Sequence, residues 1–260
     1  MSLERFHLEV DIRHAVERGE LLPHFQAQYQ IGSSRLVGAE ALIRWQHPRQ
    51  GMVSPGKFIP VAEESGLIVA VGAWILRESC RIWADWVRRG LAPGVLSVNV
   101  SGVEFRRGHV LQSVKTALAE TGLPAAFLSL EITESAIMNQ AEESIQELRA
   151  LRDLGVQLAI DDFGTGYSSL AYLKRLPLTK LKIDQGFVRG LPRDEEDGAI
   201  TRAVIALARS LQFKTIAEGV ETEAQEIFLQ AAGCEEMQGY LRARPVGAAE
   251  FEATILRAVA

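Results

Sequence analysis

Several short β-rich runs of this sequence end in, contain or are followed by polar side chains, most of them of types that can bind a metal cation. These side chains comprise five carboxylates, one amide and one lysine: Glu40, Glu131, Asp161, Asp162, Glu218, Asn99 and Lys182. Glu40 is distinctive because it lies inside an otherwise apolar run, Val37 to Ile43, where an unpaired buried carboxylate is costly. Binding a cation would offset that cost, so we expect Glu40 to be a metal ligand. We expect the other side chains to converge on the same site.

Converging carboxylates repel one another unless cations neutralise them. Mg²⁺ and Mn²⁺ prefer oxygen ligands from Asp, Glu and Asn. The sequence offers more carboxylates than one ion needs, which suggests two ions. A pair of ions suits phosphodiester hydrolysis because the ions activate water and stabilise the attacking and leaving oxygens. A second chemistry stays open from the residues alone: carboxylate-bound Mg²⁺ can stabilise an enediolate, with a lysine as the base.

The adjacent carboxylates of Asp161 and Asp162 favour the first chemistry without deciding it. One of two neighbouring carboxylates can bridge a pair of ions while the other serves the second ion. They precede Phe163-Gly164-Thr165-Gly166, whose glycines allow a tight loop. This loop does not continue as a dinucleotide fingerprint, because Ser169 stands where a third glycine would be.

The elements that must position these groups alternate between strand-like and helix-like segments. The predicted strands are 22–31, 36–43, 95–100, 127–132, 156–160, 180–183, 213–217 and 234–240. Apolar residues at helical spacing fill the segments between them, for example over 145–154 and 200–211, and Ser101-x-x-Glu104 and Thr222-x-x-Gln225 are capping boxes. About eight alternating units predict an α/β fold, a (β/α)8 TIM-like barrel, in which the carboxyl ends of the strands surround one mouth.

The first two predicted strands depart from this pattern. Only four residues, Gly32 to Arg35, separate them, and no crossover helix fits there. We therefore expect one antiparallel strand near the start of the barrel. We treat residues 1–260 as a single domain, with residues 1–20 forming an N-terminal helix that leads into the barrel.

Composition excludes several classes of protein. The chain of 260 residues is 47% apolar with a net charge of −5, which argues against disorder and against a broad basic face for DNA or RNA. Two cysteines rule out a disulfide scaffold, and no zinc motif is present. The charged N-terminus is not a signal peptide, and the longest apolar run, Leu67 to Leu76, is too short to cross a bilayer. We expect a cytoplasmic chain, alone or as the cytoplasmic domain of a longer, membrane-bound protein.

The ordered motifs resemble those of EAL-domain cyclic di-GMP phosphodiesterases over almost the whole chain. The matching strings are Glu40-Ala41-Leu42-Ile43-Arg44, Ser54-Pro55-Gly56-Lys57-Phe58-Ile59-Pro60, Asn99-Val100-Ser101, Glu131-Ile132-Thr133-Glu134, Asp161-Asp162-Phe163-Gly164, Lys182-Ile183-Asp184, Glu218-Gly219-Val220-Glu221 and Gln238-Gly239-Tyr240. Departures are few: Ala27 replaces a frequent proline, and Arg242 stands where an apolar residue is usual.

The resemblance implies hydrolysis of cyclic di-GMP to linear 5′-pGpG with Mg²⁺ or Mn²⁺, two ions per active site. It implies one ion held by Glu40, Asn99, Glu131 and Asp161, and a second held by Asp161, Asp162 and Glu218. Lys182 would orient the attacking water, and Glu218 has also been interpreted in the family as a general base. Further residues match positions that contact the dinucleotide: Gln26, Leu42, Arg44, Glu221 and Gln238. Glu134 matches a residue that steadies the loop from Asp161 to Ser169.

The resemblance also implies partners and one competing function. Family members form homodimers through an interface coupled to that loop, and they can carry sensor or GGDEF domains outside a chain of this length. Some EAL domains have lost catalytic residues and act as cyclic di-GMP receptors or protein-binding modules. Because this sequence keeps the complete ligand set, we expect an active hydrolase rather than a catalytically silent receptor.

Overall fold

A closed barrel of eight strands forms the centre of the molecule. The computed structural model describes residues 3–33, 35–91, 94–138, 141–164 and 173–257. The barrel strands are β1 (Leu21–Gln30), β2 (Leu36–His47), β4 (Val95–Val100), β5 (Leu128–Thr133), β6 (Gln157–Phe163), β7 (Lys180–Ile183), β8 (Lys214–Ala217) and β9 (Glu236–Met237). Two short strands, β3 (Gly51–Val53) and β10 (Val246–Gly247), extend the sheet beside β2 and β1.

The barrel has one antiparallel strand. β1 pairs antiparallel with β2 on one side and with β9 on the other, whereas the pairs from β2–β4 round to β8–β9 are parallel. A short connection joins β1 to β2, and Gln30 N donates to Arg35 O across it at 2.8 Å. The predicted (β/α)8 barrel with an antiparallel strand near its start is confirmed.

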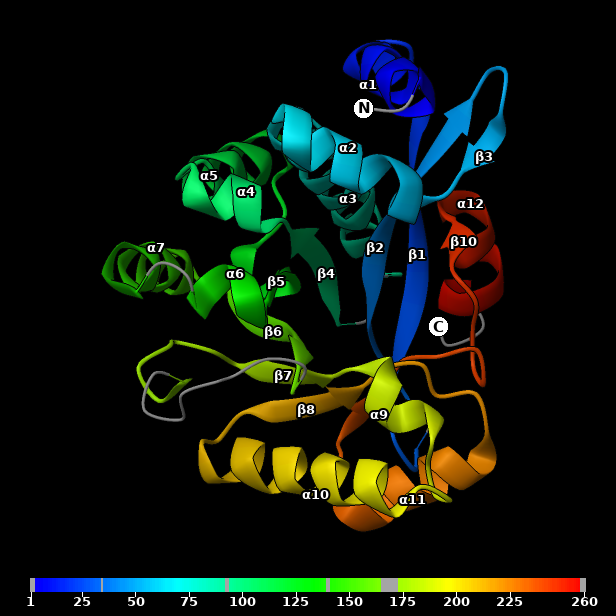
Figure 1. Ribbon diagram of the computed structural model, residues 1–260, viewed down its shortest axis with the longest axis vertical. Helices are drawn as coiled ribbons and strands as arrows, with labels where there is room; N and C mark the ends of the chain where they lie inside the picture. The colour runs from blue at the N-terminus through cyan, green and yellow to red at the C-terminus, as the bar shows by residue number, and fades with distance from the viewer. Residues whose placement is uncertain (1–2, 34, 92–93, 139–140, 165–172, 258–260) are drawn as a thin grey trace.

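Helices surround this barrel (Figure 1). They are α1 (Leu3–Ala15), α2 (Pro55–Ser65), α3 (Ile68–Arg88), α4 (Gly102–Arg106), α5 (Val110–Thr121), α6 (Glu134–Met138), α7 (Ala141–Asp153), α9 (Gln185–Arg189), α10 (Glu195–Ser210), α11 (Glu223–Ala232) and α12 (Ala248–Phe251). Both predicted capping boxes are present, at the start of α4 and of α11. None of the described helices combines the length and the hydrophobicity that a membrane crossing requires.

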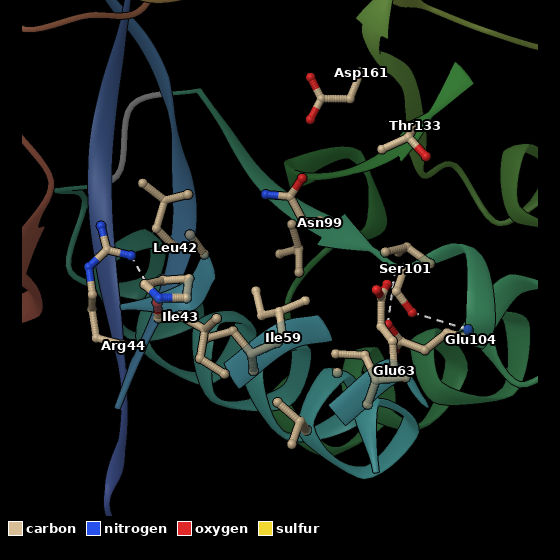
Figure 2. Close-up of a pocket in the computed structure, with 18 of the residues that line it drawn as sticks. Leu42, Ile43, Arg44, Ile59, Glu63, Asn99, Ser101, Glu104, Thr133 and Asp161 are labelled. Atoms are coloured by element: carbon tan, nitrogen blue, oxygen red, sulfur yellow. Dashed lines mark hydrogen bonds between the residues drawn. The ribbon is translucent and has the colours of Figure 1, made fainter. Parts of the chain in front are cut away.

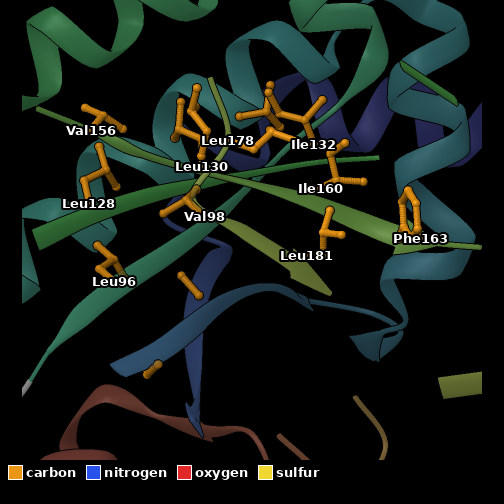
Figure 3. Packing of buried hydrophobic residues seen from close by; sticks show 14 of the residues in the cluster. Leu96, Val98, Leu128, Leu130, Ile132, Val156, Ile160, Phe163, Leu178 and Leu181 are labelled. Carbon is orange, nitrogen blue, oxygen red and sulfur yellow. The ribbon is translucent and has the colours of Figure 1, made fainter. Parts of the chain in front are cut away.

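Residues alternate between two environments along the central strands. Leu96, Val98, Leu128 and Leu130 are buried in the layer between the strands and their covering helices (Figure 3). The alternate positions of the same strands carry polar residues, because successive side chains of a strand point to opposite faces. The interior of the barrel therefore receives the polar set Ser97, Asn99, Ser129, Glu131, Asp161 and Lys182.

A second apolar cluster lies where α1 and α2 pack against the far half of β2. Leu8 and Ile12 of α1 are buried there with Trp45 and Phe58. Asp11 of α1 also lies 3.0 Å from the buried ring of His47 at the end of β2. These contacts attach the N-terminal helix to the barrel wall.

The last barrel strand is shorter than predicted. The sequence favours a strand over 234–240, but β9 covers Glu236–Met237 only. Beyond it the chain hydrogen-bonds to the segment after β8: Val220 N donates to Gln238 O at 3.1 Å, and Leu241 N donates to Val220 O at 3.0 Å. These backbone hydrogen bonds replace the bonds that a longer β9 would form with a longer β8.

Candidate functional site

The ammonium group of Lys182 lies inside the barrel among four carboxylates. It is 2.6 Å from Glu218 Oε1, 3.1 Å from Asp161 Oδ1 and 3.8 Å from Glu40 Oε2, and it also hydrogen-bonds to Glu131 Oε2. Its side chain is 1% exposed. Glu131, Asp161 and Lys182 come from the carboxyl-terminal halves of β5, β6 and β7, and Glu218 directly follows β8, whereas Glu40 lies within β2.

Burial dominates the electrostatics of this cluster. It raises the pKa of Glu131 to about 7 and the pKa of Glu218 well above its usual range, although Lys182 opposes both shifts. Burial by itself would lower the pKa of Lys182, but the surrounding carboxylates outweigh it and raise that pKa well above its usual value. The ammonium is therefore the fixed positive charge of the site.

Asp161 and Asp162 turn their carboxylates towards Glu218. One oxygen from each of these three residues lies within 4.8 Å of the others. Asp162 reaches this place with φ of 54°, in the left-handed region that costs a non-glycine residue energy and that Asp tolerates better than most. Burial, and then the neighbouring Asp161, raise the pKa of Asp162 to about 6.

Amide side chains surround the carboxylate of Glu40. Asn99 Nδ2 donates to Glu40 Oε1 at 2.5 Å, and Gln238 Nε2 donates to Glu40 Oε2 at 2.6 Å. Gln238 Nε2 also donates to Gln26 Oε1 at 3.0 Å, and Gln28 Nε2 donates to Gln238 Oε1 at 2.9 Å. The network explains how a carboxylate 5% exposed is tolerated inside an apolar strand.

These residues fit divalent cations. Five carboxylates, Glu40, Glu131, Asp161, Asp162 and Glu218, share a single lysine, so the site carries an excess of negative charge. In addition, Glu131 Oε1 is buried and has no hydrogen-bond partner among the described residues. A buried oxygen without a partner beside excess carboxylates is the environment that hard cations stabilise.

A cavity of about 320 Å³ opens beside the cluster (Figure 2). Asp161 and Asn99 lie at one end of it, and Glu63, Ser101 and Glu104 lie at the other. Its walls are largely apolar and include Leu42, Arg44, Pro55 and Ile59. This first cavity brings two of the residues predicted to contact a ligand, Leu42 and Arg44, next to the carboxylates.

A second cavity of about 260 Å³ lies on the other side of Leu42 and Asp161, which line both. The remaining lining residues are mostly polar: Gln26, Glu40, Gln185, Glu218, Gly219, Glu221, Gln238, Gly239 and Tyr240. Every predicted metal ligand except Glu131 and all five predicted contact residues thus line one or both cavities, and Glu131 and Lys182 join them through the carboxylate cluster.

Glu134 lies outside this centre, at the start of α6. It is 3% exposed, and its Oε2 accepts a hydrogen bond from Gly164 N at 3.1 Å. Residues 165–172, which hold most of the predicted glycine loop including Ser169, lie outside the described residues. Asp184 is the N-cap of α9, where its carboxylate accepts from Gly186 N, and it also lies beside Asp162, where its charge helps to raise the pKa of that carboxyl.

Gln28, Gln185 and Tyr240 belong to the site or its cavities but were not among the predicted residues. A signal for Gln28 exists in the sequence, because it stands two residues after Gln26 in a predicted strand and so shares its face. The other two follow strand ends, where turn geometry decides the direction of the side chain.

Comparison with protein families matches the EAL domain over residues 9–245 of this chain. The chain belongs to the EAL domain family. The curated relatives of this EAL domain include the bifunctional diguanylate cyclase/cyclic di-GMP phosphodiesterase MucR of Pseudomonas aeruginosa, 45% identical over 97% of this chain and 37% of MucR. The cyclic di-GMP phosphodiesterase NbdA of the same organism is 41% identical over 96% of this chain and 32% of NbdA. The EAL domain described here therefore spans about a third of the length of these relatives.

A solved structure agrees with the fold of this EAL domain. The PaMucR phosphodiesterase in complex with c-di-GMP is 46% identical and superposes with a TM-score of 0.91, covering 94% of this chain and 99% of that one.

Proposed function

We propose that this EAL domain hydrolyses cyclic di-GMP to linear 5′-pGpG with two divalent cations, Mg²⁺ or Mn²⁺. The observation that supports it best is the cluster of four carboxylates around Lys182, with Asp162 beside two of them, next to two cavities. The relatives named as cyclic di-GMP phosphodiesterases support the choice of substrate and argue against the enediolate chemistry.

The ligands would divide between two ions. Glu40, Asn99, Glu131 and Asp161 would hold one ion, and Asp161, Asp162 and Glu218 would hold the other. When bound, such ions lower the pKa of water and stabilise negative charge on phosphoryl oxygens. The short distances from Lys182 to Glu218 and Asp161 place its ammonium beside both sets of ligands.

Lys182 acts on the reaction through its charge. Its ammonium orients the attacking water by donating a hydrogen bond and offsets the negative charge that develops on the phosphate in the transition state. Glu218 would hold one ion rather than act as an isolated base. Its carboxylate is fixed by Lys182 at 2.6 Å, which suits a ligand of defined position.

The substrate would lie across both cavities. Leu42 and Asp161 line both, so a scissile phosphate beside Asp161 leaves one nucleotide on each side. Arg44 would bind a phosphate with its planar fork once it releases Ile43 O, to which its Nη1 now donates at 2.8 Å. Gln26, Glu221 and Gln238 would contact the nucleotide in the second cavity.

Chromatography of cyclic di-GMP incubated with the purified chain tests the proposal. We expect pGpG with Mg²⁺ or Mn²⁺ and none with EDTA. Binding of cyclic di-GMP without any product under either metal would contradict hydrolysis and would fit a silent receptor. Homodimerisation, and sensor or GGDEF segments outside this chain, stay predictions from the family resemblance.

A further inference from the structure

Gln28 is a buried amide in the barrel interior that lies behind the substrate cavities. It stands on β1, two residues after Gln26 and on the same face of that strand, and it is 1% exposed. It is not among the described residues that line the first or the second cavity. Its Nε2 donates to Gln238 Oε1 at 2.9 Å. An effect of Gln28 on the reaction would therefore pass through a neighbouring side chain.

The amide of Gln238 is held in one orientation by three hydrogen bonds. Its Oε1 accepts from Gln28 Nε2, while its Nε2 donates to Glu40 Oε2 at 2.6 Å and to Gln26 Oε1 at 3.0 Å. Turning the amide over would bring two NH2 groups together at Gln28 and two oxygens together at Glu40. Gln28 therefore favours the orientation in which Gln238 presents its NH2 group to the carboxylate.

The carboxylate of Glu40 is in turn fixed through both of its oxygens. Oε2 accepts from Gln238 Nε2, and Oε1 accepts from Asn99 Nδ2 at 2.5 Å. A carboxylate oxygen has more than one lone pair, so each oxygen can accept such a hydrogen bond and still ligate a cation. Groups that hold a ligand from behind set its direction, and their loss weakens metal binding by about 10- to 100-fold.

We propose that Gln28 is a positioning residue for the cation ligand Glu40, acting through the amide of Gln238. We refer to this arrangement as the Gln28–Gln238–Glu40 relay. The inference rests on the proposed function, because Glu40 is a ligand of the proposed ions, and it deepens that function by adding a residue behind the ligands. Gln26 supports the same orientation, since its Oε1 accepts from Gln238 while its Nε2 is anchored on Ala243 O at 3.1 Å.

Titration of the metal-free chain with Mn²⁺, followed by electron paramagnetic resonance, tests the relay without requiring turnover. Gln28→Met fills a similar volume but has no donor, so we expect the Kd for Mn²⁺ to rise about fivefold. Gln30→Met is the matched control and should keep the Kd of the parent. Gln30 stands two residues further along β1 and accepts from Arg35 Nε in the connection to β2.

A double variant tests the route through Gln238. Gln238→Met should raise the Kd for Mn²⁺ at least about 10-fold. Gln28→Met should add no further effect in that background, because residues that act along one route are not additive. An additive effect would show that Gln28 acts without Gln238 and would overturn the relay. A parent-like Kd for Gln28→Met would also overturn it, and a lower melting temperature with that Kd would indicate a purely structural role.

The outcome stays distinguishable from failure of the proposed function. If the parent binds Mn²⁺ but forms no pGpG, hydrolysis is rejected and the comparison of Kd values still tests the relay. If the parent binds no Mn²⁺, the relay is measured in the metal-free chain from the side-chain NH2 signal of Gln238 in ¹⁵N-resolved NMR spectra, identified by its absence in Gln238→Met. That signal should shift in Gln28→Met and not in Gln30→Met. An unchanged signal in Gln28→Met would overturn the relay.

Discussion

Lys182 Nζ lies 2.6 Å from Glu218 Oε1, where the carboxyl end of β7 meets the segment that follows β8. A backbone hydrogen bond from Glu218 N to Ile183 O, 3.1 Å long, fixes the relative position of the two segments. The pair is therefore set by strand geometry rather than by flexible side chains. It gives the site one immobile positive charge among its ligands.

Removing that charge should abolish turnover. For Lys182→Met we expect the rate of pGpG formation to fall at least about 100-fold, because no other cationic side chain contacts these carboxylates among the described residues. Lys180→Met is the matched control. Lys180 lies on the same strand, is also buried, and pairs with Glu236 at 2.5 Å at the other end of the barrel.

Both lysine variants break a buried ion pair, and each should lower the free energy of unfolding by about 3 kcal/mol. Circular dichroism melts measure this loss, and rates are compared at a temperature where both are folded. Loss of activity in Lys180→Met equal to that in Lys182→Met would show that destabilisation, not chemistry, explains the effect.

Glu40→Ala should eliminate product formation and weaken binding of divalent cations. The change removes an oxygen ligand and the acceptor of Asn99 Nδ2, and it leaves Gln238 Nε2 with Gln26 Oε1 as its remaining acceptor. Titration with Mn²⁺, followed by electron paramagnetic resonance, measures binding independently of activity. Glu236→Ala, which removes a buried carboxylate at the other end of the barrel, is the control. Parent-like hydrolysis by Glu40→Ala would refute the assignment of ligands.

The strands that carry the ligands were predictable because their residues alternate. In Leu96-Ser97-Val98-Asn99 the apolar side chains pack towards helices and the polar ones face the barrel interior. The same alternation predicts that Gln28 faces the barrel interior, because it stands two residues after Gln26 in the same strand. The contacts of Lys182 with four carboxylates were not predictable, since they depend on how far each side chain reaches across the barrel.

Strand ends limit prediction most. The sequence continues a β-rich pattern to Tyr240, but hydrogen bonds with Val220 take the chain out of the sheet after Met237. Propensity does not encode this competition between two sets of backbone bonds. The direction of Tyr240, and hence its place in the second cavity, follows from the tertiary contact alone.

Glu134 should affect activity through the start of the loop that follows β6. Glu134→Ala removes the acceptor of Gly164 N, and we expect kcat to fall about 10-fold because Asp161 and Asp162 lie directly before that loop. Glu134→Gln keeps an acceptor oxygen and should restore most of the rate. Steady-state kinetics with Mg²⁺ measures both. Equal rates for the Ala and Gln variants would show that this hydrogen bond does not position the aspartates.

Glu104, at the far end of the first cavity, should make stability depend on pH. Burial raises the pKa of its carboxyl group to about 7, and the neighbouring Glu63 adds to the shift. Because the pKa is higher in the folded chain than in the unfolded chain, the folded state is most stable at a pH below the unfolded pKa, near 4.5. This contribution to the free energy of unfolding is lost as pH rises through 7. Glu104→Gln removes this titration and keeps the capping box, because glutamine also accepts from Ser101 N.

We therefore expect Glu104→Gln to match the parent in free energy of unfolding at pH 5 and to exceed it by roughly 1–3 kcal/mol at pH 8. Urea denaturation at both pH values measures the difference. Glu120→Gln, on the exposed face of α5, reports the effect of removing one surface carboxylate. A gain for Glu104→Gln that is the same at pH 5 and pH 8 would mean that Glu104 is ionised in both folded and unfolded chains, and that the carboxyl at the end of the cavity keeps its charge.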